Sequence, residues 1–430
     1  MPVTLRQLQT HIESIVPQPG IRLVENLATI IFESAPPQFL ELFDAPQLTA
    51  LAQGAIDLMR QRPAGETAVR AYNPRLDRDG WETDYTVLEV TLEDRPFLVD
   101  SVQVCLRKKN AVLRHLIHPI LSVDHDAEGR IQEIFLGHTA ATTVESYELF
   151  LIDRIEDELR LEELKTEVES VLEDVRLATD AYTGLREKCR EARDEIISLS
   201  REAESPQVPE KASVLREYAD FLDWLDAGNF VFLGYREYQL TEADGEMFAQ
   251  VKRDSGLGIL GDARKSKYFE PVAVSTLPEQ ILNQMSGPPL LLVTKTTAES
   301  TVHRGARMDC IGIKRFNTKG QLKGEKRFVG LFTSRALSIP VNQIPILRRK
   351  LRKILELQRA KEGSHDFKQT LRILDSYPIG ELFWIEPEDL HRDVRRIMDT
   401  ERERRGRMVI RLDPSHSGFS VMVIMPREKF

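Results

Sequence analysis

Acidic side chains gather at one turn of this 430-residue chain. Glu93, Asp94 and Asp100 flank Pro96, after a run of alternating polarity and before one with helical spacing. Carboxylates at such a turn can act as general acids or bases if a cleft shifts their pKa values. They can also accept the free N–H groups at a helix N-terminus. The usual preference of acids for helix starts favours this capping role.

A glycine-rich stretch raises the question of a nucleotide site. Gly256, Gly258 and Gly261 fit the pattern G-x-G-x-x-G. A dinucleotide loop needs a helix directly after it, so that the helix N-terminus meets the pyrophosphate. Residues 262–271 lack a helical apolar repeat and end in proline, so we interpret the stretch as a plain loop.

Four histidines raise the question of a metal site. His115 and His118 lie three apart on a predicted strand and so face opposite ways, and no ligand pattern completes a site with His125 or His138.

Basic residues, which raise the question of a nucleic-acid site, cluster on a predicted hairpin near Phe316 and Phe328 and on the helix after it. They are Lys314, Arg315, Lys323, Lys326 and Arg327, then Arg348, Arg349, Lys350, Arg352 and Lys353. With a net charge of −9, solvated faces or subunit contacts are favoured over nucleic acid.

Known catalytic motifs are missing from the sequence. It has no Gly-x-Ser-x-Gly elbow, no Walker loop and no His-Glu-x-x-His pair. The three cysteines, Cys105, Cys189 and Cys310, are far apart, which favours reduced thiols in a cytoplasm. No run approaches the roughly 18 apolar residues of a membrane span, so we expect no membrane partner.

The elements around the acidic turn follow a recognisable order. Residues 84–92 alternate as a half-buried strand, and a helix follows from Leu98 to about Asn110. Three further strands are predicted within residues 112–123, 131–136 and 147–152. This β-α-β-β order, with a last strand and a helix, resembles an ACT domain. ACT domains usually have glycine after the turn proline, where this chain has Phe97.

A wider resemblance emerges when the whole chain is read. The chain is similar to the N-terminal region of the large bacterial NAD-specific glutamate dehydrogenases. The similarity is carried by an ordered set of segments: Pro96–Val102, His118–Ile120, Asn229–Tyr235, Thr301–Arg304, Asp309–Phe316, Gly330–Ser334, Ile344–Lys350, Gly363–Asp366, Tyr377–Pro378 and Glu381–Phe383.

The resemblance carries expectations about function. It implies that the complete enzyme interconverts L-glutamate with 2-oxoglutarate and ammonia, using NAD in a catalytic domain outside this segment. The segment itself is expected to have no catalytic residues, metal or cofactor. It would assemble homo-oligomers through its ACT-like units and bind a small amino-acid effector. The expected effector-binding residues are Asp94, Arg95, Pro96, Phe97, Leu98, Asp100 and Ser101.

The remaining chain supplies predicted helices and two more predicted units. Apolar spacing predicts helices within residues 5–60, followed by a polar linker over 62–80. Residues 153–203 carry an apolar seam, either a docked helix pair turning near Gly184 or an intersubunit coiled contact. Residues 226–360 read as a second α+β unit. Residues 381–385 read as a short strand that opens a further β-α-β-β order.

These patterns combine into one predicted architecture. It is an α+β fold of tandem ACT-like, ferredoxin-like βαββαβ domains with antiparallel sheets, an N-terminal helical cap and inserted helices. The predicted parts are a helical segment over 1–75, ACT-like domains over 82–204 and 215–362, and a truncated third over 378–430. The alternative hypothesis is a free-standing ACT-type protein that senses ligands without enzyme activity. A stop codon directly after Phe430 in the reading frame would favour that alternative.

Overall fold

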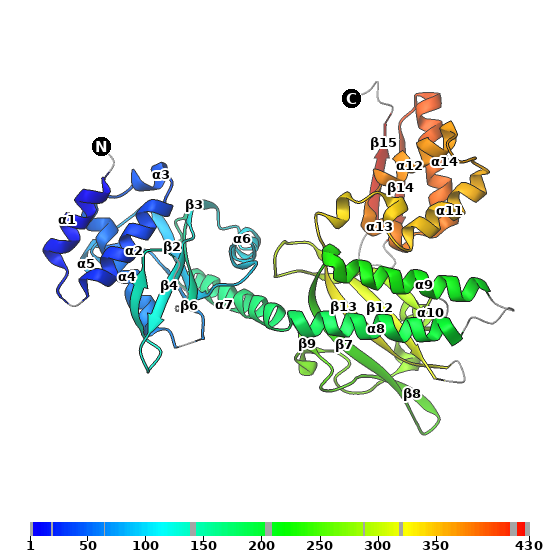
Figure 1. The fold of residues 1–430 in the computed structure, drawn as a ribbon, viewed down its shortest axis with the longest axis horizontal. Helices are drawn as coiled ribbons and strands as arrows, with labels where there is room; N and C mark the ends of the chain where they lie inside the picture. The colour runs from blue at the N-terminus through cyan, green and yellow to red at the C-terminus, as the bar shows by residue number, and fades with distance from the viewer. Residues whose placement is uncertain are drawn as a thin grey trace. The chain divides into compact units, whose positions relative to one another are not determined.

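The computed structural model describes residues 3–18, 20–63, 65–137, 143–202, 209–286, 289–317, 321–412 and 419–425. It divides into two compact units. The first comprises residues 1–176 together with 301–305, and the second comprises 177–300 together with 306–430. Figure 1 labels the elements of both.

The first unit begins with the predicted helices. They are α1 (Leu5–Ile15), α2 (Ile21–Ser34), α3 (Pro37–Leu40) and α4 (Ala45–Gln61). Thr4 and Asp44 each form a capping box, with Gln7 and Gln47 three residues later, which explains where α1 and α4 begin. We call these four helices the helical cap.

A six-stranded antiparallel sheet lies next to the helical cap. Its strands are β1 (Ala68–Tyr72), β2 (Tyr85–Glu93), β3 (Leu113–Ile117), β4 (Ile120–His125), β5 (Ile131–Phe135) and β6 (Thr143–Asp153). The order is β1-β2-β6-β4-β5, and β3 also pairs with β6. The strands predicted over 84–92, 131–136 and 147–152 are confirmed, whereas the single strand predicted over 112–123 is two strands, β3 and β4, interrupted at His118 and Pro119. The predicted linker over 62–80 is wrong, because it contains β1 and the short helix α5 (Leu76–Asp79).

Both faces of this sheet are covered. Val87, Leu149 and Leu151 join the core formed with the helical cap. Their neighbours Leu88 and Phe150 are also fully buried, and they point to the opposite face because side chains alternate along a strand. On that face lie α6 (Leu98–Lys108) and α7 (Glu158–Asp180). The structure therefore has a six-stranded sheet with helices on both faces, where a four-stranded sheet backed by two helices was expected.

The second unit contains a helical hairpin against a curled sheet. Helices α8 (Tyr182–Glu202) and α9 (Pro209–Trp224) pack together, and α8 also packs on the sheet. The seam residues Leu185, Cys189, Ala192 and Ile196 are buried within this unit, so the docked interpretation of α8 is confirmed. The helix pair is formed by α8 and α9. The turn predicted near Gly184 is wrong, because Gly184 lies inside α8.

The sheet of the second unit has seven antiparallel strands. They are β7 (Phe230–Ala243), β8 (Glu246–Val251), β9 (Leu257–Gly258), β10 (Val272–Ala273), β11 (Leu291–Glu299), β12 (Arg307–Phe316) and β13 (Leu322–Phe332). The order is β10-β8-β7-β13-β12-β11, with β9 on β7. The sheet curls like half a barrel (Figure 1). The α+β class is thus confirmed, whereas a second ferredoxin-like order is not evident.

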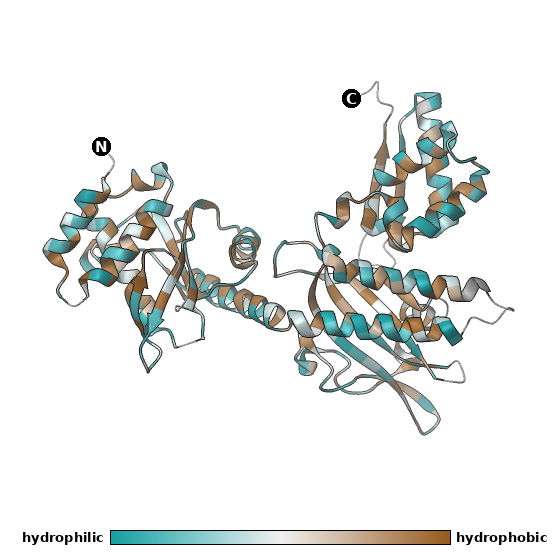
Figure 2. Ribbon diagram, in the orientation of Figure 1, coloured by the Kyte–Doolittle hydropathy of each residue, from teal (hydrophilic) through white to brown (hydrophobic). Residues whose placement is uncertain are grey.

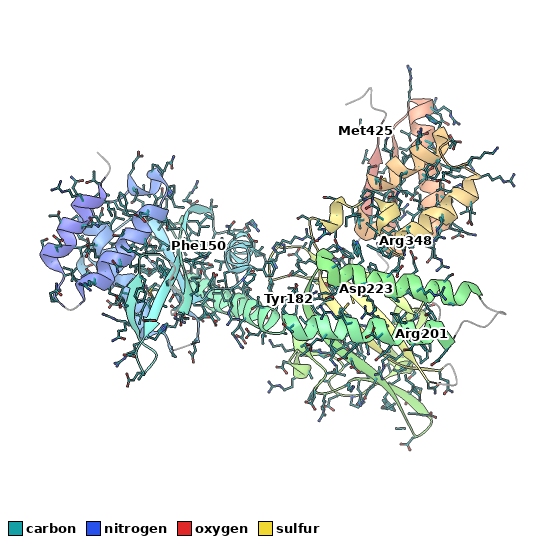
Figure 3. All side chains as sticks on the ribbon, viewed as in Figure 1. Phe150, Tyr182, Arg201, Asp223, Arg348 and Met425 are labelled. Carbon is teal, nitrogen blue, oxygen red and sulfur yellow. The ribbon has the colours of Figure 1, made fainter. Side chains whose placement is uncertain are left out.

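Helices follow this sheet. They are α11 (Leu347–Gln358), α12 (His365–Asp375), α13 (Ile379–Trp384) and α14 (Pro387–Glu403), and a shorter helix, α10 (Glu279–Ser286), precedes β11. The predicted strand over 381–385 is wrong, because these residues mainly form α13. Arg348, which is labelled in Figure 3, lies on α11. It donates to Glu217 on α9 at 2.6 Å.

A two-stranded sheet ends the described chain. Strands β14 (Arg407–Leu412) and β15 (Phe419–Ile424) pair in antiparallel register. One face of this ribbon carries exposed apolar side chains, which are Met408, Ile410, Phe419, Val421 and Val423. Figure 2 shows hydrophobic colour on the ribbon near the C-terminus. The third ACT-like unit over 378–430 stays a prediction. The strand expected at its start is the helix α13.

Candidate functional site

The acidic turn joins β2 to α6 in the first unit. The Asp94 N–H donates to the Val144 carbonyl on β6 at 3.0 Å, and Arg95 pairs with Glu93 at 3.0 Å. The residue that precedes α6 is Phe97, and no side chain caps the helix with a hydrogen bond. Asp100 does lie in the first turn of α6, where a carboxylate complements the helix dipole, although the residue at the N-cap position is Phe97.

Phe97 has an unusual backbone conformation. Its φ of 76° and ψ of 5° lie in the left-handed region, which glycine adopts readily and a bulky residue rarely does. ACT domains usually have glycine at this position, so the turn keeps a glycine-like path although its sequence differs. The strain of holding a phenylalanine there is about 1–3 kcal/mol, and the surrounding contacts have to offset it.

A distant segment supplies those contacts. Residues 301–305, between β11 and β12, belong to the first unit, and we call them the covering segment. The His303 ring packs on the Phe97 ring with centroids 4.9 Å apart. The His303 N–H donates to Ser101 Oγ at 3.0 Å, and its Nδ1 lies 3.3 Å from Asp100 Oδ2.

Two more contacts hold the covering segment in place. Thr301 Oγ1 donates to Asp174 Oδ2 on α7 at 2.8 Å. Val302 has no exposed surface. The structure thus brings three of the expected effector residues, Phe97, Asp100 and Ser101, against the covering segment. Leu98 is instead buried in the core, and Arg95 pairs with Glu93.

A buried polar cluster lies on β6 and the β3–β4 connection. His118 Nε2 hydrogen-bonds with Ser146 Oγ at 2.6 Å, and it lies 3.8 Å from Glu148 Oε1. Glu148 has no exposed surface, and within the described residues neither carboxyl oxygen has a hydrogen-bond partner. Burial and the nearby Asp94 charge raise the pKa of Glu148 to about 8, so Glu148 is mostly protonated at neutral pH.

This cluster was not among the residues predicted from the sequence. Its signal was a charged residue at an inward position of the otherwise apolar run 147–152. The histidine pair has no shared role: the His115 ring packs against Phe39 and Tyr85, away from His118. His138 lies outside the described residues. Across the part of the chain that the structure describes, no three His, Cys, Asp or Glu side chains are placed to hold a metal.

The glycine-rich stretch has a structural explanation. Gly258 has a φ of 61°, and a Cβ there would lie 2.2 Å from the Leu233 carbonyl oxygen. A Cβ on Gly256 would lie 2.4 Å from the Leu260 oxygen. The stretch is thus a tight turn on β7, followed by the three-residue turn 263–265 where a dinucleotide loop has a helix.

Three basic residues of the predicted hairpin form ion pairs within the protein. Arg315 pairs with Glu237 at 3.0 Å, and Lys326 with Glu195 at 2.5 Å. Arg327 pairs with Glu325 and stacks 4.5 Å from the Tyr238 ring. These three cations are thus paired with carboxylates inside the second unit.

The fold and these sites define a class of protein region: an ACT-like domain followed by a helical module. Two family models match the chain, "Glutamate dehydrogenase, ACT1 domain" over residues 27–168 and "Glutamate dehydrogenase, helical motif 1" over residues 344–403. The second match covers α11 to α14, the segment in which a strand had been expected.

Full-length relatives extend the match. The chain is 30% identical over 428 residues to the NAD-specific glutamate dehydrogenase of Halomonas elongata, covering 99% of this chain and 26% of the relative. The enzymes of the same name from Pseudomonas aeruginosa and Mycobacterium tuberculosis are 30% and 27% identical over 91% and 87% of this chain. The chain is a region of the large NAD-specific glutamate dehydrogenase family, covering its ACT1 domain and helical motif 1. It spans about a quarter of the length of these relatives.

No helix among the described residues is both long enough and apolar enough to cross a membrane.

Proposed function

We propose that this chain is the regulatory and assembly region of an NAD-dependent glutamate dehydrogenase. In the complete enzyme, L-glutamate, NAD and water would yield 2-oxoglutarate, ammonia and NADH in a separate catalytic domain. The observation that carries the proposal is the turn at Phe97. It keeps the backbone path of an ACT turn, and it is surrounded by packing and hydrogen bonds in place of a nucleophile–base pair.

The regulatory part of the proposal concerns a small amino acid at the turn. The expected residues are Asp94 to Leu98, Asp100 and Ser101, and the covering segment contacts three of them. An effector would therefore compete with the covering segment for the turn. Its binding free energy would shift the chain toward the state in which the segment has moved away.

Calorimetric titration of the chain with each of the twenty amino acids tests this role. His303→Gly sharpens the test, because glycine tolerates the φ of 70° at this position and removes the ring from Phe97. We expect the variant to bind an effector about tenfold more tightly, since less contact must be broken. His365→Ala, which changes an exposed histidine of the second unit, should leave the affinity unchanged. Heat with none of the twenty, in either protein, removes the effector role.

The assembly part rests on the sheet edges. Strands β1 and β5 lie at the ends of the first sheet, and β10 and β11 lie at the ends of the second. Edge strands present backbone N–H and C=O groups that a second copy of the chain can pair with. Sedimentation velocity over a hundredfold concentration range tests this role. A single monomeric species throughout would contradict it.

A further inference from the structure

A cavity of about 640 Å³ lies in the first unit, at the β1 edge of the sheet. It is distinct from the turn at Phe97. The helical cap and α5 form its walls, and Trp81 also lines it. A volume in this range accommodates a metabolite-sized ligand. Its polar lining includes Asp57, Arg60, Arg70, Tyr72, Arg78 and Asp79.

Arg70 is held rigidly in this cavity. Its Nε and Nη2 donate to Glu89 Oε2 at 2.8 and 2.5 Å. Glu89 has no exposed surface and also accepts from the Tyr147 hydroxyl at 2.7 Å. The Arg70 guanidinium lies 4.5 Å from the centre of the Tyr72 ring, a cation–π contact. A charge fixed from two sides loses little conformational entropy when it binds a ligand.

One edge of the Arg70 guanidinium remains available. Within the described residues, its Nη1 donates no hydrogen bond, and a third of the side chain is exposed. An arginine fork presents donors that match the two oxygens of a carboxylate. The free edge therefore suits a carboxylate at the base of the cavity.

Gly54 keeps the space in front of Arg70 open. It lies inside the 17-residue helix α4, where glycine costs about 1 kcal/mol relative to alanine. A Cβ at this position would lie 3.2 Å from Arg70 Nη2. The helix thus has a poor helix former at a position where a side chain would crowd the guanidinium.

The cavity mouth offers charges of both signs. Arg78 is paired with Asp79 at 2.8 Å, which leaves Arg60 and Asp57, both exposed and three residues apart on α4, facing the opening. We propose that this cavity binds a small carboxylate-bearing metabolite, with the carboxylate at Arg70 and Arg60. Asp57 would favour ligands that also carry an ammonium group. The site is independent of the turn at Phe97, and either can exist without the other.

Titration calorimetry with L-glutamate, L-aspartate, 2-oxoglutarate, succinate and inorganic phosphate tests the site. We expect binding of at least one carboxylate probe. The two amino acids differ from 2-oxoglutarate and succinate by their ammonium group and so report on Asp57. Binding of phosphate alone, or of no probe at millimolar concentration, would overturn the proposal.

Two variants locate the binding. Gly54→Leu fills the space before Arg70 and should abolish binding, and Arg60→Ala should weaken it about tenfold, the effect of losing one charged contact. Arg22→Ala, an exposed arginine of α2 that does not line the cavity, is the matched control. If Gly54→Leu does not fold, Gly54→Ala serves instead, since alanine strengthens the helix. Unchanged affinity in both the Gly54 and Arg60 variants would overturn the assignment. His303→Gly should leave this binding intact, which separates the site from the turn.

Discussion

The backbone N–H of His303 donates a hydrogen bond to Ser101 Oγ at 3.0 Å, although the two residues are 202 positions apart in the sequence. Ser101 Oγ in turn donates to the Phe97 carbonyl at 2.6 Å. One buried hydroxyl therefore connects the strained turn to the covering segment. This small group holds two stretches of backbone that no local sequence pattern associates.

Replacing Ser101 with alanine tests this connection. The His303 N–H would lose its acceptor, at a cost of about 1–2 kcal/mol. We expect faster amide hydrogen exchange within residues 301–305, measured by mass spectrometry, and a matching fall in unfolding free energy. Ser198→Ala is the control, because Ser198 makes a similar bond to Asp194 on an exposed helix face. Equal exchange at 301–305 in all three proteins would contradict the proposed link.

Local sequence patterns predicted the first unit well. Strand β2 and helix α6 follow from a clean change of period, from two to between three and four, at Pro96. The strand predicted over 381–385 is a helix, α13, because the four-residue apolar run Leu382–Ile385 is too short to show a period. The contact between His303 and Phe97 could not be predicted from the sequence, since contacts between distant residues leave no periodic pattern in a single sequence.

Glu148 predicts an unusual pH dependence. Its pKa rises from 4.5 to about 8 in the folded state. Between these values the folded chain keeps a proton that the unfolded chain loses, so stability falls as pH rises, by up to about 5 kcal/mol. Glu148→Gln should remove this slope and be the more stable protein at pH 8. His118, whose pKa burial lowers, acts in the opposite direction below pH 6.5.

Urea unfolding at pH 5, 6, 7, 8 and 9 measures the effect. Glu156→Gln, which alters an exposed carboxylate of the same unit, should follow the wild-type curve. A Glu148→Gln variant whose stability declines with pH as steeply as the wild type would show that Glu148 is already ionised when folded.

Gly258 predicts a large cost for a single methyl group. In Gly258→Ala the Cβ meets the Leu233 carbonyl oxygen at 2.2 Å, and the left-handed φ adds strain. We expect a loss of about 2–4 kcal/mol in thermal or urea unfolding. Gly245→Ala shares the positive φ, but has open space around its Cβ, and should lose only about 1 kcal/mol. Comparable losses would mean that backbone conformation, and not the approach to β7, requires glycine at 258.

Lys350 predicts a structural role for a residue that the sequence placed on the solvent side of α11. Its ammonium group donates to the carbonyls of Leu382, Phe383 and Ile385 at 3.0, 2.6 and 2.7 Å. These carbonyls end α13, where helical partners are lacking. Lys350→Met keeps the length of the side chain and removes the donors. Because the three residues are buried, we expect a loss of about 2–3 kcal/mol in the free energy of unfolding by urea.

Lys353→Met is the control, because Lys353 lies one turn further along α11 and is exposed. This variant should change stability by less than about 0.5 kcal/mol. Since both variants remove one positive charge, only the difference between them reports on the carbonyls, and equal losses would assign the effect to net charge.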